Sequence, residues 1–231
     1  MTIRGKWLKN KNVLLITVFS LIACMAHGAM LYTPFNTYVH TSAAKVVLFM
    51  LVPFMYFKIS KDGKFTGLFT IKGDNKSIKQ SIILGIIAFV FIIIAFPVVR
   101  PWLDSYMIIE TMSNVGITAD NYIFVAMYYV FVNVALEELF FRGFVFLTLY
   151  RMNYKIYAHV YSSLLFSVYH IAIISGGITT GLLLLSVIGL IIVGLMFNEI
   201  SRRCQNVVGS IIIHASASLA IGLIGFYFLY Y

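Results

Sequence analysis

Residues 121–149, NYIFVAMYYVFVNVALEELFFRGFVFLTL, form the stretch that decides the fold. Phenylalanine, valine and leucine dominate it, and its charged residues are Glu137, Glu138 and Arg142. A helix needs about 20 predominantly apolar residues to cross a bilayer core of about 30 Å, and this stretch is longer than that. It therefore predicts a transmembrane helix that carries charge at hydrocarbon depth, where ionised groups are costly.

The rest of the chain has the same character. It is 61% hydrophobic and 11% charged, whereas a soluble domain is about 25% charged. We expect an all-α polytopic membrane protein with a single membrane domain over residues 1–231, because the pattern of a transmembrane β-barrel is missing. The first span resembles a signal peptide, but we expect it to be retained. Hydropathy predicts about seven transmembrane helices, at residues 12–32, 43–57, 80–99, 121–149, 156–175, 181–200 and 206–230.

The basic residues predict the orientation. The N-terminus, the loop after the second span and the next two even-numbered turns carry almost all of the lysines and arginines. By the positive-inside rule we expect a multi-pass protein of the cell membrane with a cytoplasmic N-terminus and an outer C-terminus. The net charge of +9 is explained by this placement, so nucleic acid is not an expected partner, whereas membrane lipid is.

Depth in the membrane separates the ionisable residues of the spans. At 1.5 Å of rise per residue, Glu137 lies ~20 Å and His170 ~21 Å from the inner ends of their helices, and His214 lies ~12 Å from that of its own. Three non-consecutive helices thus bring a carboxylate and two imidazoles to comparable depth. Such groups face a bundle interior or a water-filled cavity, so we interpret them as one site.

Other polar residues of the spans are interpreted as interfacial or structural. His27 and Lys45 lie near the outer ends of the first two spans, where their side chains can reach the interface, so we set them aside. Asn133, one turn before Glu137, is interpreted as a polar contact between helices. The residues expected to be satisfied at the cytoplasmic interface are His159, Asn198 and Glu199.

The two adjacent glutamates are predicted to have different roles. Glu138 and Arg142 are i and i+4 on a helix, so they can pair without help from another helix. Glu137 is turned about 100° away from Glu138 and can face elsewhere. A carboxylate beside histidines in a dry site suits a general base. We therefore expect Glu137 to be the chemical group and Glu138 with Arg142 to support it.

Three motifs resemble those of the CPBP family. EELFFR at 137–142 matches EExxxR, FSVYH at 166–170 matches FxxxH, and HASAS at 214–218 aligns with HxxxN or HxxxD. This family comprises Rce1-like CAAX endopeptidases of the membrane and bacterial Abi proteins linked to bacteriocin processing and immunity. The resemblance covers residues 120–225. One departure is Ser218, where the family has asparagine or aspartate.

The resemblance implies an intramembrane endopeptidase. Glu137 would activate the attacking water with help from His170, and His214, together with Ser218, would stabilise the oxyanion. The substrate would be a membrane-presented peptide or protein, such as a bacteriocin or peptide-pheromone precursor or a CAAX-like protein. The catalytic residues would be Glu137, Glu138, Arg142, His170, His214 and Ser218. A divalent metal such as zinc, held by Glu137, His170 and His214, and a metal-free mechanism both stay open.

Two other functions stay open. A non-catalytic immunity protein or membrane scaffold of the same family would use the fold to bind a partner, and Ser218 is the residue that favours this alternative. A proton-coupled transporter could use the same glutamate and histidines as a relay. The sequence lacks the inverted repeats and paired broken helices of many transporters, which disfavours transport.

Overall fold

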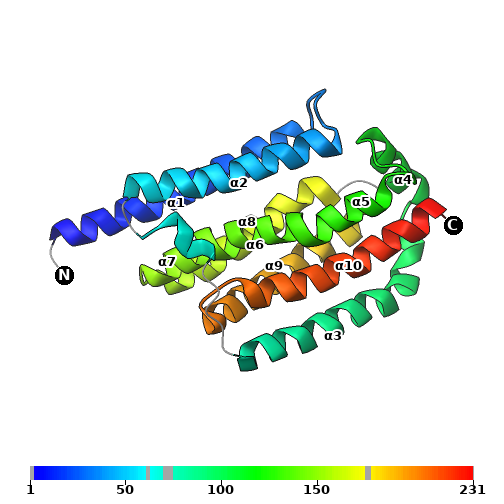
Figure 1. Ribbon diagram of the computed structural model, residues 1–231. Coiled ribbons are helices and arrows are strands. Elements are labelled where there is room, and N and C mark those ends of the chain that lie inside the picture. Colours follow the sequence, from blue (N-terminus) through cyan, green and yellow to red (C-terminus); the bar gives the residue numbers. More distant parts are fainter. Residues whose placement is uncertain (1–2, 61–62, 70–74, 175–177, 231) are drawn as a thin grey trace.

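The described residues of the computed structural model, 3–60, 63–69, 75–174 and 178–230, are almost wholly helical (Figure 1). No strand occurs within these ranges, where Leu103 and Ile178 form an isolated bridge. In the described part of the chain, seven helices are long and apolar enough to cross a membrane, which confirms the predicted all-α polytopic fold. They are Asn10–Met30, Tyr38–Ser60, Ser77–Trp102, Tyr122–Arg151, Lys155–Ile174, Thr180–Cys204 and Val208–Tyr230.

The spans correspond to the following helical segments. The first three contain α1 (Ile3–Met30), α2 (Tyr38–Ser60) and α3 (Asn75–Val99), with the short 3₁₀ turns η1 (Phe65–Phe69) and η2 (Arg100–Trp102) between or after them. The fourth is a continuous rod of α5 (Tyr122–Met127), η3 (Tyr128–Asn133), α6 (Val134–Glu138), η4 (Leu139–Leu147) and α7 (Thr148–Arg151). The last three are α8 (Lys155–Ile174), α9 (Thr180–Cys204) and α10 (Val208–Tyr230).

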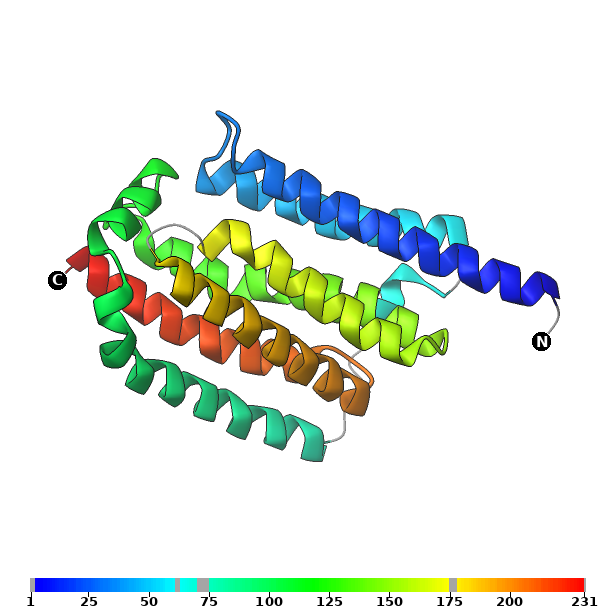
Figure 2. The same ribbon diagram turned by 180° about the vertical axis from the view of Figure 1, so that it is seen from behind.

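The fourth span lies at the centre of the bundle. The α1–α2 hairpin covers one side of it, α8 and α9 lie behind it in Figure 1, and α10 follows on the other side with α3 beyond (Figures 1 and 2). Every residue from Phe140 to Leu149 is buried, as expected of a helix that neighbours surround on all sides. Phe140 stacks on Phe49 of α2 with ring centroids 4.0 Å apart, and Phe141 meets Phe166 of α8 edge to face at 5.3 Å.

Two parts of the central span are π-helical, which the sequence did not predict. Segments η3 and η4 have the wider i→i+5 hydrogen-bond pattern of a π-helix. Between them lies the short α-helical segment α6, which carries both glutamates. The hydroxyl of Thr148 donates to the carbonyl of Gly143, five residues earlier, at 3.4 Å. π-Helical turns are rare and occur frequently at functional sites.

Two elements differ in length from the prediction. The second span begins at Tyr38 rather than residue 43, because its first turns carry polar side chains that hydropathy counts as loop. The connection at residues 100–120 contains the helix α4 (Ser105–Asn114), which was expected to be loop. The side chain of Asp104 caps it by accepting from the amide of Met107 at 3.1 Å.

The contact between α8 and α9 depends on small and polar residues. Asn198 of α9 is fully buried, and its amide nitrogen donates to the hydroxyl of Ser163 at 3.0 Å and to the carbonyl of His159 at 3.2 Å. The prediction that Asn198 is satisfied at the interface is therefore wrong, because these bonds place it inside the bundle. One turn earlier, a Cβ atom on Gly194 would lie 3.1 Å from the backbone Cα of Ser163.

We predict that Gly194→Val separates α8 from α9 and lowers the stability of the protein. Inserting methyl groups into a close-packed contact costs about 1–3 kcal/mol. Gly189→Val, on the same helix, is the matched control, because a Cβ atom there has no atom within 4 Å among the described residues. Thermal unfolding in detergent should show a lower Tm for Gly194→Val alone, and equal Tm values for the two variants would contradict the prediction.

Candidate active site

Glu137 lies at the centre of the candidate site. Its side chain is 2% exposed, and its two oxygens face different partners. Oε1 accepts from Nζ of Lys45 at 3.0 Å and from Nδ2 of Asn133 at 3.0 Å. Oε2 faces Nε2 of His170 at 3.5 Å and Nε2 of His214 at 3.9 Å. One oxygen is thus held in place, and the other is turned toward the two imidazoles.

The hydrogen bond of His170 fixes its tautomer. Nδ1 lies 2.8 Å from the carbonyl oxygen of Phe166, one turn earlier on α8. A carbonyl oxygen only accepts, so Nδ1 carries the proton and donates it. In the neutral ring Nε2 is then an acceptor, and its lone pair faces Oε2 of Glu137.

His214 is oriented in the same way by Glu138. Nδ1 of His214 lies 2.9 Å from Oε1 of Glu138, which also accepts from Nη1 of Arg142 at 3.2 Å. Because arginine keeps Glu138 an acceptor, Nδ1 of His214 donates, and its Nε2 is also free to accept. The predicted ion pair between Glu138 and Arg142 is present, and Glu138 has the further role of orienting His214.

Arg142 completes the site beneath the imidazoles. It is fully buried, and its guanidinium lies over the ring of Phe166 at 4.0 Å and that of Phe197 at 4.9 Å. A cation over an aromatic face is attracted by the ring quadrupole, most strongly where water is excluded. Phe166 also packs on His170 with centroids 4.4 Å apart, so it supports the site by packing.

The three acceptor atoms of Glu137, His170 and His214 fit a metal site by geometry. They all lie within 4.8 Å of one another. Two ligands of a tetrahedral zinc ion, each ~2.0–2.1 Å from it, lie ~3.3–3.5 Å apart. The measured separations of 3.5 and 3.9 Å are close to this value. Carbonyl and carboxylate acceptors at each Nδ1 orient the rings as they do around zinc-binding histidines.

Ser218 is buried on α10 but is occupied elsewhere. Its side chain interacts with that of Tyr129 on the central span. Within the described part of the chain, Ser218 forms no hydrogen bond with Glu137, His170 or His214. The structure therefore does not bring the sixth predicted residue into direct contact with the three that converge.

Lys45 and His27 were set aside from the sequence, and this interpretation is wrong. Both are buried, and Lys45 donates to Glu137 and to Oδ1 of Asn133, the latter at 2.5 Å. His27 packs on Tyr169 with ring centroids 5.4 Å apart. Nearness to a span end suggested exposure, but α8 and the central span cover this part of the α1–α2 hairpin. Asn133 is also more than a helix contact, because it bonds the central glutamate.

A signal for Lys45 was present in the sequence of the second span. The buried residues of α2 are Thr41, Lys45, Phe49, Pro53 and Tyr56, which recur every three or four positions on one helix face. Lys45 therefore shares a face with apolar core residues. Glu199, by contrast, pairs with Arg202 and Arg203 at 2.7 Å each and is partly exposed, away from the site.

We predict that Arg142→Met destabilises the protein strongly. Removing one partner of a buried ion pair leaves an uncompensated charge and costs about 3–5 kcal/mol. Replacing both partners, in Glu138→Gln/Arg142→Met, should recover much of this loss. Arg202→Met, which breaks a partly exposed pair, should cost about 0.2–1 kcal/mol. Denaturation in detergent checks this order, and a similar loss for Arg142→Met and Arg202→Met would contradict it.

Comparison with known proteins identifies the segment that carries the site. Residues 119–220 match the family model described as type II CAAX prenyl endopeptidase Rce1-like. This range nearly coincides with the 120–225 of the resemblance and contains Glu137, His170 and His214. A search of curated proteins found no match, and a search of solved structures found none either. The family is a protease family and indicates CAAX-type peptidase activity in a multi-pass membrane protein. The segment that carries the site, residues 119–220, is therefore similar to the Rce1-like type II CAAX prenyl endopeptidases.

Proposed function

We propose that this chain is an intramembrane endopeptidase in which Glu137 activates a water molecule for attack on a peptide bond. The observation that carries the proposal is the convergence of three acceptor atoms, Oε2 of Glu137 and Nε2 of His170 and His214, in a buried part of the bundle. A water molecule donates two hydrogen bonds and is a natural ligand for such acceptors. The family match supports hydrolysis as the chemistry.

The proposed reaction begins when Oε2 of Glu137 accepts a proton from the water. The oxygen of that water forms a bond with the carbonyl carbon of the substrate, and the carbonyl oxygen becomes an oxyanion. Collapse of this intermediate breaks the bond between carbon and nitrogen, and the proton held by Glu137 passes to the leaving amine. His170 orients the water through its free Nε2.

His214 is the proposed group for stabilising the oxyanion. For this role His214 takes up a proton from solvent, which turns Nε2 from an acceptor into a donor, and the carboxylate of Glu138 at Nδ1 compensates the positive charge. A donor aimed at developing charge in a dry site contributes strongly to catalysis. If Glu137, His170 and His214 held zinc, the metal would supply Lewis-acid polarisation of the scissile carbonyl.

The proposed substrate is a peptide or protein segment presented at the membrane. Glu137 and the two histidines belong to transmembrane helices, so the scissile bond must reach them within the bilayer. A bacteriocin or peptide-pheromone precursor, or a protein with a CAAX-like end, meets this requirement. The interaction of Ser218 with Tyr129, rather than with the three converging residues, supports the second candidate, a non-catalytic immunity protein or scaffold of the same family.

We predict that Glu137→Gln abolishes cleavage by the folded protein. Glutamine keeps the shape of the side chain but cannot take a proton from water, and loss of a general base lowers rates by about 10²–10⁴-fold. Mass spectrometry of membrane peptides should show one or more peptides processed in cells with the wild-type protein and intact in cells with the variant. Glu110→Gln, which removes an exposed carboxylate of α4, is the matched control and should be processed as wild type.

Undiminished processing by a folded Glu137→Gln variant would contradict the proposed mechanism. If a bacteriocin is found against which the wild type protects, protection that survives loss of Glu137, His170 and His214 would favour the immunity protein instead. Peptide processing and protection from the bacteriocin can both be measured in the same wild-type and variant strains.

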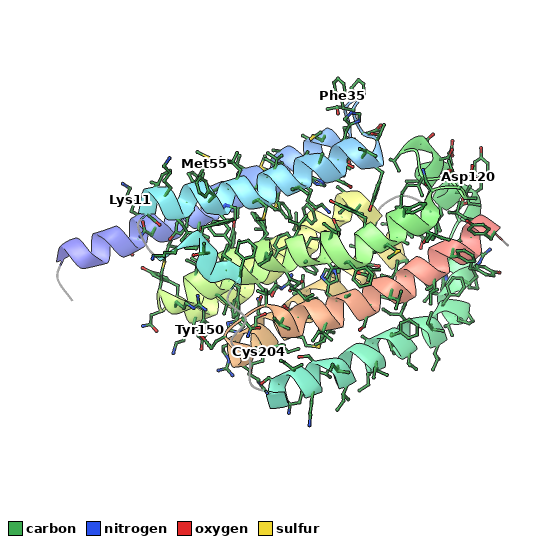
Figure 3. All side chains as sticks on the ribbon, viewed as in Figure 1. Lys11, Phe35, Met55, Asp120, Tyr150 and Cys204 are labelled. Atoms are coloured by element: carbon green, nitrogen blue, oxygen red, sulfur yellow. The ribbon has the colours of Figure 1, made fainter. Side chains whose placement is uncertain are left out.

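We further propose that the protein lies in the cell membrane with its N-terminus in the cytoplasm. The N-terminal end, the start of α3 and the connections α7–α8 and α9–α10, which carry the basic residues, lie at one end of the bundle (Figure 1). Figure 3 shows Lys11, Tyr150 and Cys204 toward this end and Asp120 at the other. The basic end would face the cytoplasm by the positive-inside rule.

We predict that a membrane-impermeant maleimide labels Asp120→Cys in intact cells and Ile156→Cys only after the membrane is opened. Both positions are exposed, and they lie at opposite ends of the bundle. The wild-type protein is the control, since Cys24 and Cys204 are buried. Labelling of Ile156→Cys but not Asp120→Cys in intact cells would reverse the proposed orientation.

A further inference from the structure

Lys45 places a charged group on the core-facing side of α2, outside the segment that matches the family. Its neighbours on that face are Thr41 one turn before and Phe49 one turn after. The side chain of Lys45 is buried (6% exposed), although the residue lies only two turns from the start of α2. A buried ammonium is retained only where partners compensate its charge, so its contacts carry information.

The ammonium of Lys45 is bound on three sides. Nζ donates to Oδ1 of Asn133 at 2.5 Å and to Oε1 of Glu137 at 3.0 Å. It also lies over the ring of Tyr169, 5.3 Å from the centroid. These partners come from the central span and from α8, so one side chain of the hairpin connects with both helices that build the site.

Asn133 closes this arrangement into a triangle. Its amide oxygen accepts from Lys45, and its Nδ2 donates to Oε1 of Glu137 at 3.0 Å. The orientation of the amide is determined, because an ammonium only donates and a carboxylate only accepts. Oε1 therefore receives two donors in a fixed geometry, and Oε2 is left to face His170 and His214.

Lys45 also balances the buried charge. Glu138 is paired with Arg142 on its own helix, and Glu137 would otherwise share that single cation. With Lys45 paired to Glu137, two buried carboxylates have two buried cations. The compensation for Glu137 comes from a helix that the family match does not include.

We propose that Lys45 is a positioning residue of the active site, which holds Oε1 of Glu137 so that Oε2 is aimed at the water-binding point between His170 and His214. The proposal rests on the proposed function of Glu137. It makes the α1–α2 hairpin part of the catalytic unit rather than a membrane anchor, because the docked hairpin supplies a group that the chemistry needs.

The test measures kcat and KM of purified full-length protein in vesicles. The probe is the membrane peptide whose processing separates wild-type from Glu137→Gln cells, synthesised as a quenched fluorescent substrate. Lys45→Met removes both hydrogen bonds and the charge at similar length. We expect kcat to fall about 10- to 100-fold, the usual effect of losing a group that orients a reactive residue, with KM unchanged.

Phe49→Leu is the structural control on the same helix face. It weakens the stacking of the hairpin on Phe140, which has a centroid distance of 4.0 Å, and leaves Lys45 in place. We expect it to lower Tm and to leave the kcat of the folded protein unchanged. If Lys45 served hairpin packing alone, Lys45→Met would likewise lower Tm and leave the kcat of the folded protein unchanged.

Lys45→Arg provides a variant that keeps the buried charge if Lys45→Met fails to fold. The guanidinium is longer and planar, so it satisfies charge compensation but presents its donors at other positions. Positioning predicts a reduced kcat at unchanged KM for the folded arginine variant. Wild-type kcat in folded Lys45→Arg or Lys45→Met overturns the proposal.

Glu137→Gln separates failure of this inference from failure of the proposed function. An inactive Glu137→Gln together with a fully active, folded Lys45 variant rejects the role of Lys45 alone. An active Glu137→Gln, or the absence of any peptide that distinguishes the strains, rejects the function and the inference with it.

Discussion

The fold is organised around the burial of two adjacent carboxylates at hydrocarbon depth. An isolated ionised carboxylate in such a place is strongly destabilising, so each one needs partners that are also buried. Glu138 finds Arg142 on its own helix and His214 on α10. Glu137 finds Lys45 on α2 and faces His170 on α8. The helices around the central span are therefore tied to it by polar groups at one depth, and apolar packing fills the remaining contacts.

The local geometry of the central span supports this division between the two glutamates. Both lie in α6, and each bonds a residue of a flanking segment four positions away: Asn133 of η3 reaches Glu137, and Arg142 of η4 reaches Glu138. The segments on either side are π-helical and hence wider. A change in the number of residues per turn rotates the residues beyond it relative to a regular helix.

Periodicity and depth were sufficient to predict the seven spans, the ion pair of Glu138 with Arg142, and the convergence of Glu137 with His170 and His214. These features depend on local spacing or on position along an apolar run, both of which can be read directly from a sequence.

Lys45 was missed because its distance from the span end suggested exposure, whereas exposure depends on which helices pack over it. The π-helical segments and the capped helix α4 were missed for a similar reason, since hydropathy reports apolar content and not backbone geometry. The engagement of Ser218 with Tyr129 depends on tertiary contact between α10 and the central span, to which the HxxxS spacing gives no clue.

The net charge of the buried site affects the binding of a water molecule and of a divalent cation differently. With neutral imidazoles, the buried charges of Glu137, Glu138, Lys45 and Arg142 sum to zero. A water molecule adds no charge to this set, so it binds without further compensation. A divalent cation has suitable donor atoms in Glu137, His170 and His214, but its charge would act on the ammonium of Lys45 through a medium that screens poorly. Lys45 already provides positive charge to Glu137 at Oε1, whereas the candidate metal ligands converge at Oε2. The donor atoms of Glu137, His170 and His214 thus fit zinc as well as water, and the charge of Lys45 is where the two ligands would differ in electrostatic cost.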